Sequence, residues 1–396
     1  MTLEPPPSRR PEFDALLRFL TAAPAERPRL APRVAEAVGA DSLERIVQAT
    51  LTRTGRPVAV TDSPDGLLVT GEEGQVRAWA RAAPDGGLAA LYLEGARHTP
   101  PRGRRLRVPY GLLVILVAVA NVVALWTASD RTAWCTDLTV LALCGVLVEG
   151  LGAPAQQPRL PRRTVEAGTV VATLASASRL PELPTGNGTL GLSITVVVLL
   201  ALLGAVAVGR TRTWRAPLSQ PLRFPLEGVW YVVQGGARPL NHHAGVPEQR
   251  GAVDLAGLGR YGSRTRGGHE LTAFAAYGRA VRAPCDGRVV SAEGAIEDQD
   301  AGPGARARYQ PPYGNHVFID TGREIVKLAH LRAGSLTVSR GDTVRAGQLV
   351  GETGNSGNTT EPHLHLHAER DGVGLDLRFT DVPGRLYRGR VIRTFP

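Results

Sequence analysis

The distribution of hydrophobic and polar positions divides the 396-residue chain into regions of different character. Residues 1–40 are rich in Pro, Ala and Arg and contain no apolar run typical of a signal peptide, so we expect them to be disordered and cytoplasmic. In residues 41–100 a helical pattern is followed by four short apolar or alternating runs between Gly, Asp and Pro, which predicts a small α+β module of unknown role. The expected helix covers 43–51, and the expected strands cover 57–60, 67–69, 76–79 and 88–93.

Two long stretches, 108–129 and 183–209, carry no charged side chain. The first follows a group of arginines, and the second is most apolar over 190–209. A helix that spans a bilayer needs about 20 apolar residues, and basic residues favour its cytoplasmic flank. We therefore expect two transmembrane helices within a membrane region at 101–215, the first of which enters from the cytoplasm.

A third apolar stretch, 138–148, is short and is bounded by Asp137 and Glu149. It fits a soluble core segment, a re-entrant piece or a third span over 136–152. The alternatives matter because two spans return the C-terminal region to the cytoplasm, whereas three place it outside. Basic residues after the last span favour the cytoplasm for that flank, and a slightly larger set in the preceding loop favours the opposite orientation. The two sets are Arg210, Arg212 and Arg215, and Arg159, Arg162, Arg163 and Arg179.

Beyond residue 220 the chain consists of short apolar runs punctuated by glycine, such as 343–345 and 349–352. This spacing predicts an antiparallel β sandwich or barrel over 220–396. The net charge of +10 suits work near an anionic surface. Nucleic acid is not the expected partner, because the sequence has no basic helix interleaved with aromatics, no zinc-finger spacing and no phosphate-binding loop. The three cysteines indicate neither a disulfide framework nor a metal site, and we expect them to be small buried residues.

Eight of the nine histidines lie beyond residue 240. In 362–367 histidine alternates with leucine, so a strand here would point His363, His365 and His367 to one face and the leucines into the core. Catalytic zinc is usually held by three protein ligands with a water in the fourth position. The alternation therefore offers His365 as one candidate ligand.

A second polar segment lies upstream of this strand. Asp254 alternates with apolar residues over 252–256, as in a strand with a carboxylate on its polar face, and the adjacent His242 and His243 precede it. Asp254 and one of the paired histidines can complete a three-ligand site with His365.

Four segments in this order resemble the lysostaphin/LytM-type zinc endopeptidases, over roughly residues 226–380. They are 243–254, 283–290, 329–331 and 354–365, the last reading Gly-Asn-Ser-Gly-Asn-Thr-Thr-Glu-Pro-His-Leu-His. The resemblance implies that His243, Asp254 and His365 bind one zinc ion per chain and that His330 and His363 are catalytic. Ten residues separate His243 from Asp254 where the family usually has three, which indicates an inserted loop and leaves His242 as an alternative to His243.

The resemblance further implies a membrane-anchored endopeptidase that hydrolyses peptide cross-links or stem peptides of peptidoglycan through a zinc-activated water. Such a substrate requires an extracytoplasmic C-terminal domain, and so it predicts that 136–152 crosses the membrane. One alternative is a non-catalytic domain that binds peptidoglycan or activates a partner hydrolase. Another is a carrier-like barrel built on 283–290 and 340–351, although no recognisable attachment-lysine motif lies between these segments.

The remaining histidines receive simpler interpretations. His98, His269 and His316 are expected to be surface or hydrogen-bonded structural residues, because an isolated histidine in a β domain is more often structural than a ligand. His367 shares a face with His365, and the sequence leaves open whether it lines the groove, supports the metal site or is purely structural. The oligomeric state is not indicated.

Overall fold

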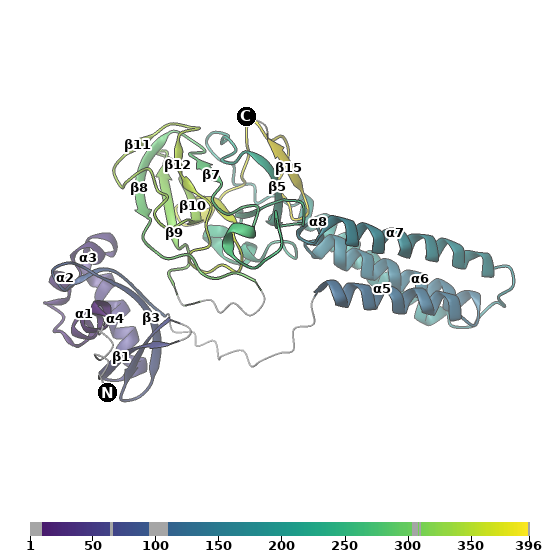
Figure 1. The fold of residues 1–396 in the computed structure, drawn as a ribbon, viewed down its shortest axis with the longest axis horizontal. Helices are drawn as coiled ribbons and strands as arrows, with labels where there is room; N and C mark the ends of the chain where they lie inside the picture. Colours follow the sequence, from purple (N-terminus) through teal and green to yellow (C-terminus); the bar gives the residue numbers. More distant parts are fainter. Residues whose placement is uncertain (1–9, 64–65, 95–109, 303–307, 309, 395–396) are drawn as a thin grey trace, which may run out of the picture. The chain divides into compact units, whose positions relative to one another are not determined.

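The computed structural model describes residues 10–63, 66–94, 110–302, 308 and 310–394 (Figure 1). The chain divides into two compact units. The first comprises residues 1–105 with two short later segments, and the second comprises the remainder.

The first unit packs helices against a four-stranded antiparallel sheet with the order β1-β2-β3-β4. The helices are α1 (Pro11–Thr21), α2 (Arg27–Leu30), α3 (Pro32–Val38) and α4 (Ala40–Thr54). The strands are β1 (Pro57–Ser63), β2 (Gly66–Gly71), β3 (Gln75–Ala82) and β4 (Leu88–Leu93). The predicted helix and all four predicted strands within 41–100 are therefore confirmed.

The expectation of disorder up to residue 40 is wrong for α1 to α3. Leu16, Phe19 and Leu20 on α1 are buried with Val47 of α4 and Leu88 of β4 in one hydrophobic cluster. The high content of Pro, Ala and Arg concealed this apolar face, which becomes stable only when the sheet covers it. Residues 1–9 lie outside the described part of the chain.

The second unit begins with four helices. These are α5 (Tyr110–Thr127), α6 (Arg131–Val146), which continues as the π-helical turn η1 (Leu147–Leu151), α7 (Arg159–Ser176) and α8 (Thr189–Thr211). Among the described residues, Arg131–Leu151 and Thr189–Thr211 are long and apolar enough to cross a membrane, and Leu116–Thr127 forms a shorter apolar helix. The stretch left open by the sequence is thus part of a helix of membrane length. Residues 108 and 109 of the first predicted span lie outside the described residues.

Helix α7 was not predicted, because its arginine-rich first turns look like a loop. It carries exposed Leu160, Val170, Val171 and Leu174, so one face is apolar although the helix as a whole is not. Helix α7 therefore adds one pass of the chain along the helical bundle between α6 and α8.

Contacts between the helix ends show that each of the four helices runs antiparallel to the helix that precedes it in the chain. Near the end of α5, Trp126 Nε1 donates to Ala172 O, close to the end of α7, at 3.2 Å. Thr132 Oγ1, at the start of α6, donates at 3.0 Å to Gly186 O, which shortly precedes α8. At the opposite end of the bundle, Gly150 packs against Val206 near the end of α8. The start of α5 and the end of α8 therefore lie at the same end.

The C-terminal domain is built on a nine-stranded antiparallel sheet in the order β11-β8-β9-β10-β13-β6-β5-β15, with β14 paired to β13, while β12 and β7 form a separate pair. This confirms the predicted antiparallel β-rich domain. The strands are β5 (Gly228–Gln234), β6 (Val253–Gly257), β7 (Ala280–Arg282), β8 (Gly287–Glu293), β9 (Asn315–Asp320), β10 (Ile325–Leu331), β11 (Thr343–Val344), β12 (Leu349–Glu352), β13 (Leu364–Arg370), β14 (Val373–Gly374) and β15 (Val391–Thr394).

Candidate metal centre

Three neighbouring strands, β6, β13 and β10, carry most of the candidate site. In the register of β13 with β6, His365 lies directly opposite Asp254. In the register of β13 with β10, His365 lies opposite Ala329, and a bulge after Ala329 carries His330. Directly opposed residues have Cβ atoms about 4.5–5.5 Å apart, so sheet register alone brings these side chains together.

The predicted alternation along 362–367 is present. Leu364 and Leu366 are fully buried in the hydrophobic core, and His365 and His367 are buried among polar partners. Strand β13 starts one residue after His363. Burial of the leucines fixes the strand register, because a slip of one residue would place histidines in the core.

The ten residues between His243 and Asp254 form a compact loop of two short turns, η4 (His242–Gly245) and η5 (Pro247–Gln249). Asn241 fixes this loop. Its side-chain oxygen accepts from His243 N at 3.1 Å, and its Nδ2 donates to Ala252 O at 2.9 Å. The structure thus contains the insertion expected from the sequence, and the loop folds back so that His243 reaches Asp254.

Asp254 uses its two carboxylate oxygens on two different imidazoles. Oδ2 lies 3.0 Å from His243 Nε2, and Oδ1 lies 2.9 Å from His365 Nδ1. Burial by itself would raise the pKa of Asp254, but the hydrogen bonds with His243 and His365 outweigh it and hold the pKa well below its usual value. Asp254 is therefore a carboxylate, the form that binds a metal.

The nitrogens of His243 and His365 that point away from Asp254 have their own partners. His243 Nδ1 lies 3.0 Å from Gln249 Oε1, and His365 Nε2 lies 2.9 Å from His367 Nδ1. Gln249 Oε1 and the Asp254 carboxylate only accept, so both ring nitrogens of His243 face acceptors. Burial by itself would lower the pKa of His243, but the hydrogen bond and charge of Asp254 outweigh it and raise the pKa. A metal ion would take the place of the proton at Nε2, while Gln249 accepts from Nδ1. Burial lowers the pKa of His365 to about 3, which keeps that imidazole neutral.

His330 and His363 form a second pair of imidazoles, with ring centroids 4.7 Å apart. His330 Nδ1 donates to Ser356 O at 2.8 Å, and His363 Nδ1 donates to Glu361 O at 2.8 Å. Because a carbonyl only accepts, the neutral tautomer that fits each ring carries its proton on Nδ1 and its electron pair on Nε2. Burial, and then the charges of His363 and His365, hold the pKa of His330 well below its usual range.

The backbone of His330 is in the left-handed region, with φ of +63°. Such a conformation costs a non-glycine residue free energy and clusters at functional sites. His330 lies at the bulge in β10, and its ring centroid is 4.7 Å from that of His363. The conformation is therefore part of how the fold positions this side chain.

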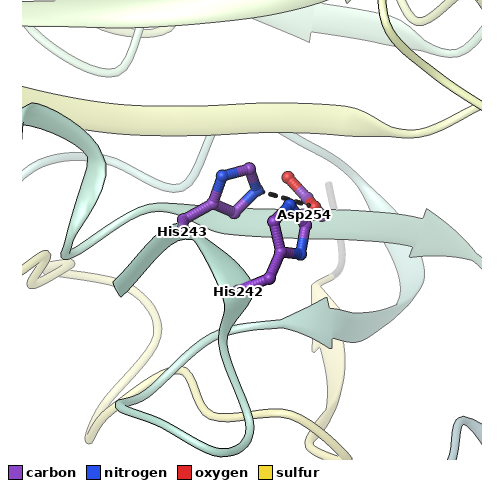
Figure 2. A group of neighbouring side chains, drawn as sticks. All are labelled: His242, His243 and Asp254. Atoms are coloured by element: carbon purple, nitrogen blue, oxygen red, sulfur yellow. Dashed lines mark hydrogen bonds and ion pairs between the residues drawn. The ribbon is translucent and has the colours of Figure 1, made fainter. Parts of the chain in front are cut away.

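His242 is a further metal-competent group. His242, His243 and Asp254 each offer a ligand atom, and these atoms lie within 4.8 Å of one another (Figure 2). His242 is exposed, and its ring lies 3.9 Å from that of His243. The structure accordingly brings together all five residues predicted for the site and adds His242 as a competing ligand, an alternative that the sequence also left open.

Supporting residues were harder to find from the sequence. Asn241 and Gln249 were not predicted as partners, since nothing in their local pattern distinguishes them. For His367, whose Nδ1 lies 2.9 Å from His365 Nε2, support of the metal site was one of the roles that the sequence left open. His316 bonds Ser291 Oγ at 2.9 Å, in agreement with its predicted structural role. His98 lies outside the described residues. All three cysteines are free, as expected, but half-buried rather than buried.

The donors present fit a zinc ion. Zinc prefers imidazole nitrogen and carboxylate oxygen, in sets of three with one open position. Here a buried carboxylate meets two imidazoles, one held from behind by Gln249 and the other by His367. His330 and His363 stand beside the set without contributing an Nδ1 atom to it, since both Nδ1 atoms are bound to carbonyls.

Residues 267–377 match the model of Peptidase family M23. This range includes His330, His363 and His365 and begins after His243 and Asp254. Among solved structures, the chain is similar to lysostaphin, with 24% identity over 36% of this chain and 44% of that chain and a TM-score of 0.23. It is similar to a zinc-containing peptidase from Vibrio cholerae, with 20% identity over 43% of this chain and 41% of that chain and a TM-score of 0.23.

The chain is also similar to the catalytic domain of the prophage-encoded M23 protein EnpA from Enterococcus faecalis, with 20% identity over 41% of this chain and 93% of that chain and a TM-score of 0.22. The similar region spans less than half of lysostaphin and of the Vibrio cholerae peptidase. With the strand order and histidine arrangement described above, the match over residues 267–377 identifies the C-terminal domain of this chain as a LytM-type domain of peptidase family M23.

Proposed function

We propose that the C-terminal domain is a zinc metalloendopeptidase in which His243, Asp254 and His365 hold one zinc ion. The observation that carries this proposal is that both oxygens of Asp254 face a ligand nitrogen, at 3.0 and 2.9 Å. We favour His365 over His242 as the third ligand because His365 is buried and held on both sides, whereas His242 is exposed. A fixed ligand loses less conformational entropy when it binds the metal.

Zinc bound here would lower the pKa of a coordinated water toward about 7 and polarise a peptide carbonyl. The chain's own residues supply the proton transfers. His330 Nε2 and His363 Nε2 are unprotonated in the neutral tautomers fixed by their carbonyl partners. One can take the proton of the attacking water, and the protonated ring can then donate to the leaving amine. The protein around Asp254 and His365 excludes solvent, which strengthens these interactions.

The proposed substrates are peptides of peptidoglycan, either cross-links or stem peptides. The match to family M23 and the resemblance to lysostaphin/LytM-type endopeptidases support this class. A non-catalytic role as a peptidoglycan-binding or activating domain is the alternative. Retention of the three proposed ligands together with His330 and His363 favours catalysis, because a domain that only binds peptide needs none of them.

Membrane anchoring is also proposed, on the two helices of membrane length. The side of the membrane on which the C-terminal domain lies depends on whether α7 also crosses. A bundle in which all four helices cross places the residues before α5 and after α8 on one side, as two spans would, whereas the three spans that a wall substrate requires would place them on opposite sides. Arginines are concentrated at that shared end, and basic flanks favour the cytoplasm. Flanking arginines at that end are Arg159, Arg162, Arg163, Arg210 and Arg212, against Arg131 and Arg179 at the other.

This arginine distribution supports a second candidate function, the same metallopeptidase chemistry on a peptide substrate at the cytoplasmic face. Only an extracytoplasmic domain reaches the mature cell wall. A reporter fused to the C-terminus of the full chain separates the two candidates. A signal from outside the cytoplasm supports wall peptidoglycan as substrate, and a cytoplasmic signal removes it.

The catalytic proposal is tested with the full-length protein in detergent, loaded with zinc and incubated with isolated peptidoglycan. We expect about one zinc ion per chain and the release of peptide fragments identifiable by mass spectrometry. His365→Ala should abolish both, whereas His316→Ala, which changes a histidine bonded to Ser291 and separated from His365 by strand β10, should retain both. Full hydrolysis by His365→Ala would show the proposed metal site to be wrong.

A further inference from the structure

The connection between α6 and α7 touches the candidate active site. We call residues 152–158 the α6–α7 segment. Its Gly152 O accepts from Arg388 Nε at 3.0 Å, and its Gln156 O accepts from Ser263 N at 3.1 Å. The Gln156 side-chain amide also donates to a carboxylate oxygen of Glu361. Three separate hydrogen bonds thus hold this segment on the C-terminal domain.

These contacts fall beside the proposed catalytic pair. Glu361 lies two residues before His363, and its main-chain oxygen accepts from His363 Nδ1 at 2.8 Å. Gln156 also lies close to the backbone next to Ser263, because a Cβ atom on Gly262 would overlap the Gln156 carbonyl. Gln156 therefore lies between the backbone of Gly262 and Ser263 on one side and Glu361, which orients His363, on the other.

Gln156 is bound in the way that a peptide ligand is bound. Its main-chain carbonyl receives a main-chain N–H, and its side-chain carboxamide donates to a carboxylate. Peptide recognition commonly combines main-chain hydrogen bonds for affinity with a side-chain pocket for selectivity. The segment itself is a short turn, in which Gln156 N donates to Ala153 O and Gln157 N donates to Pro154 O, both at 3.0 Å.

We propose that Ser263 and Glu361 form a subsite that binds a peptide through its main chain and a side-chain carboxamide, and that the α6–α7 segment fills this subsite with Gln156. A substrate peptide then binds only after the segment leaves. The gating role in this inference rests on the proposed peptidase function. The docking itself is measurable without catalysis.

The first experiment measures docking by hydrogen exchange in the full-length, zinc-loaded protein. Gln156→Ala removes the side-chain contact with Glu361. Gln157→Ala is the matched control, because the side-chain amide of Gln157 makes no such contact with Glu361 among the described residues. In Gln156→Ala we expect exchange at Ser263 to rise about tenfold, as for the loss of one hydrogen bond to a charged group. Unchanged exchange would overturn the proposal.

The second experiment measures whether the subsite is then free. The probe is a capped hexapeptide with the sequence of residues 153–158, Ala-Pro-Ala-Gln-Gln-Pro. It should bind Gln156→Ala at least about tenfold more tightly than the unaltered protein or Gln157→Ala. Adding Glu361→Ala to Gln156→Ala should remove this gain. Equal binding to all four proteins would show that the segment does not occupy a peptide subsite.

Hydrolysis gives a third and separate result. If the unaltered protein cleaves peptidoglycan, Gln156→Ala should cleave faster, and an unchanged rate despite faster exchange would overturn the gating role. If no protein cleaves any peptide, the proposed function fails. In that case the exchange and peptide-binding results still decide whether Ser263 and Glu361 form the subsite.

Discussion

At the scale of single residues, the site depends on how each imidazole proton is fixed. Main-chain carbonyls receive the Nδ1 protons of His330 and His363, and Gln249 lies 3.0 Å from Nδ1 of His243. An acceptor therefore lies beside Nδ1 of each of these three rings, and in the tautomer with its proton on Nδ1 the electron pair lies on Nε2.

His330→Ala tests the proton-transfer role. We expect the hydrolysis rate to fall by about 10²- to 10⁴-fold, the usual contribution of a positioned acid or base. Zinc content should stay near that of the unaltered protein, because His330 Nδ1 is committed to Ser356 O. Rate and metal content are measured on the same preparation, with His316→Ala as the control. A loss of zinc in His330→Ala would instead make this residue a ligand.

His367→Ala tests the support behind His365. The fully buried His367 has its Nδ1 2.9 Å from His365 Nε2 and its Nε2 3.7 Å from Glu369, which in turn pairs with Lys327 at 2.9 Å. Outer partners of metal-binding histidines typically contribute about 10- to 100-fold in metal affinity. We expect a loss of that size in a zinc competition titration, with His365→Ala losing more. Unaltered affinity would assign His367 a purely structural role.

At the scale of elements, an ion pair joins two helices of the first unit. Arg27 of α2 is buried, and its Nη1 contacts both carboxylate oxygens of Glu44 in α4 at 2.7 Å. The hydrogen bond from Arg27, followed by that from Gln48, lowers the pKa of Glu44. Helix α2 has only four residues, so such contacts rather than its own length keep it folded.

This pair predicts a pH dependence of the first unit's stability. Because the folded-state pKa of Glu44 is lowered, its contribution is present above the unfolded value of about 4.3 and is lost as pH falls through the folded value. Glu44→Gln should therefore lower the melting temperature at pH 7, and the difference should shrink below about pH 4. Calorimetry across this range checks it, with exposed Glu36→Gln as the control. A difference that is constant with pH would contradict it.

At the scale of the whole molecule, the metal should stabilise one unit and not the other. Zinc at 100 times its dissociation constant adds about 2.7 kcal/mol to the unfolding free energy of the domain that binds it. For a domain of this size, this corresponds to roughly 5–10 °C in melting temperature. A chelator should therefore lower the melting transition of the C-terminal domain by that amount and leave the transition of the N-terminal unit in place. Equal shifts in both transitions would contradict a single site at Asp254.

Much of this organisation could be predicted from local sequence. The alternation of His363, His365 and His367 with leucine specified a strand and its polar face, because side chains along a strand alternate with a period of two. Length and uncharged composition specified the apolar helices. Short runs between glycines specified the strands of both units. Each of these features depends on neighbours along the chain, which the sequence displays directly.

The tertiary structure alone decided the rest. Whether His242 or His243 meets Asp254 depends on how Asn241 folds a ten-residue loop, and the sequence shows only the length of that loop. Helix α7 has too few apolar residues to be recognised alone and forms against its neighbours. The placement of Gln156 beside Glu361 joins positions 205 residues apart. Contacts of this kind follow from packing of the whole chain, because no local pattern records which distant surface a segment will meet.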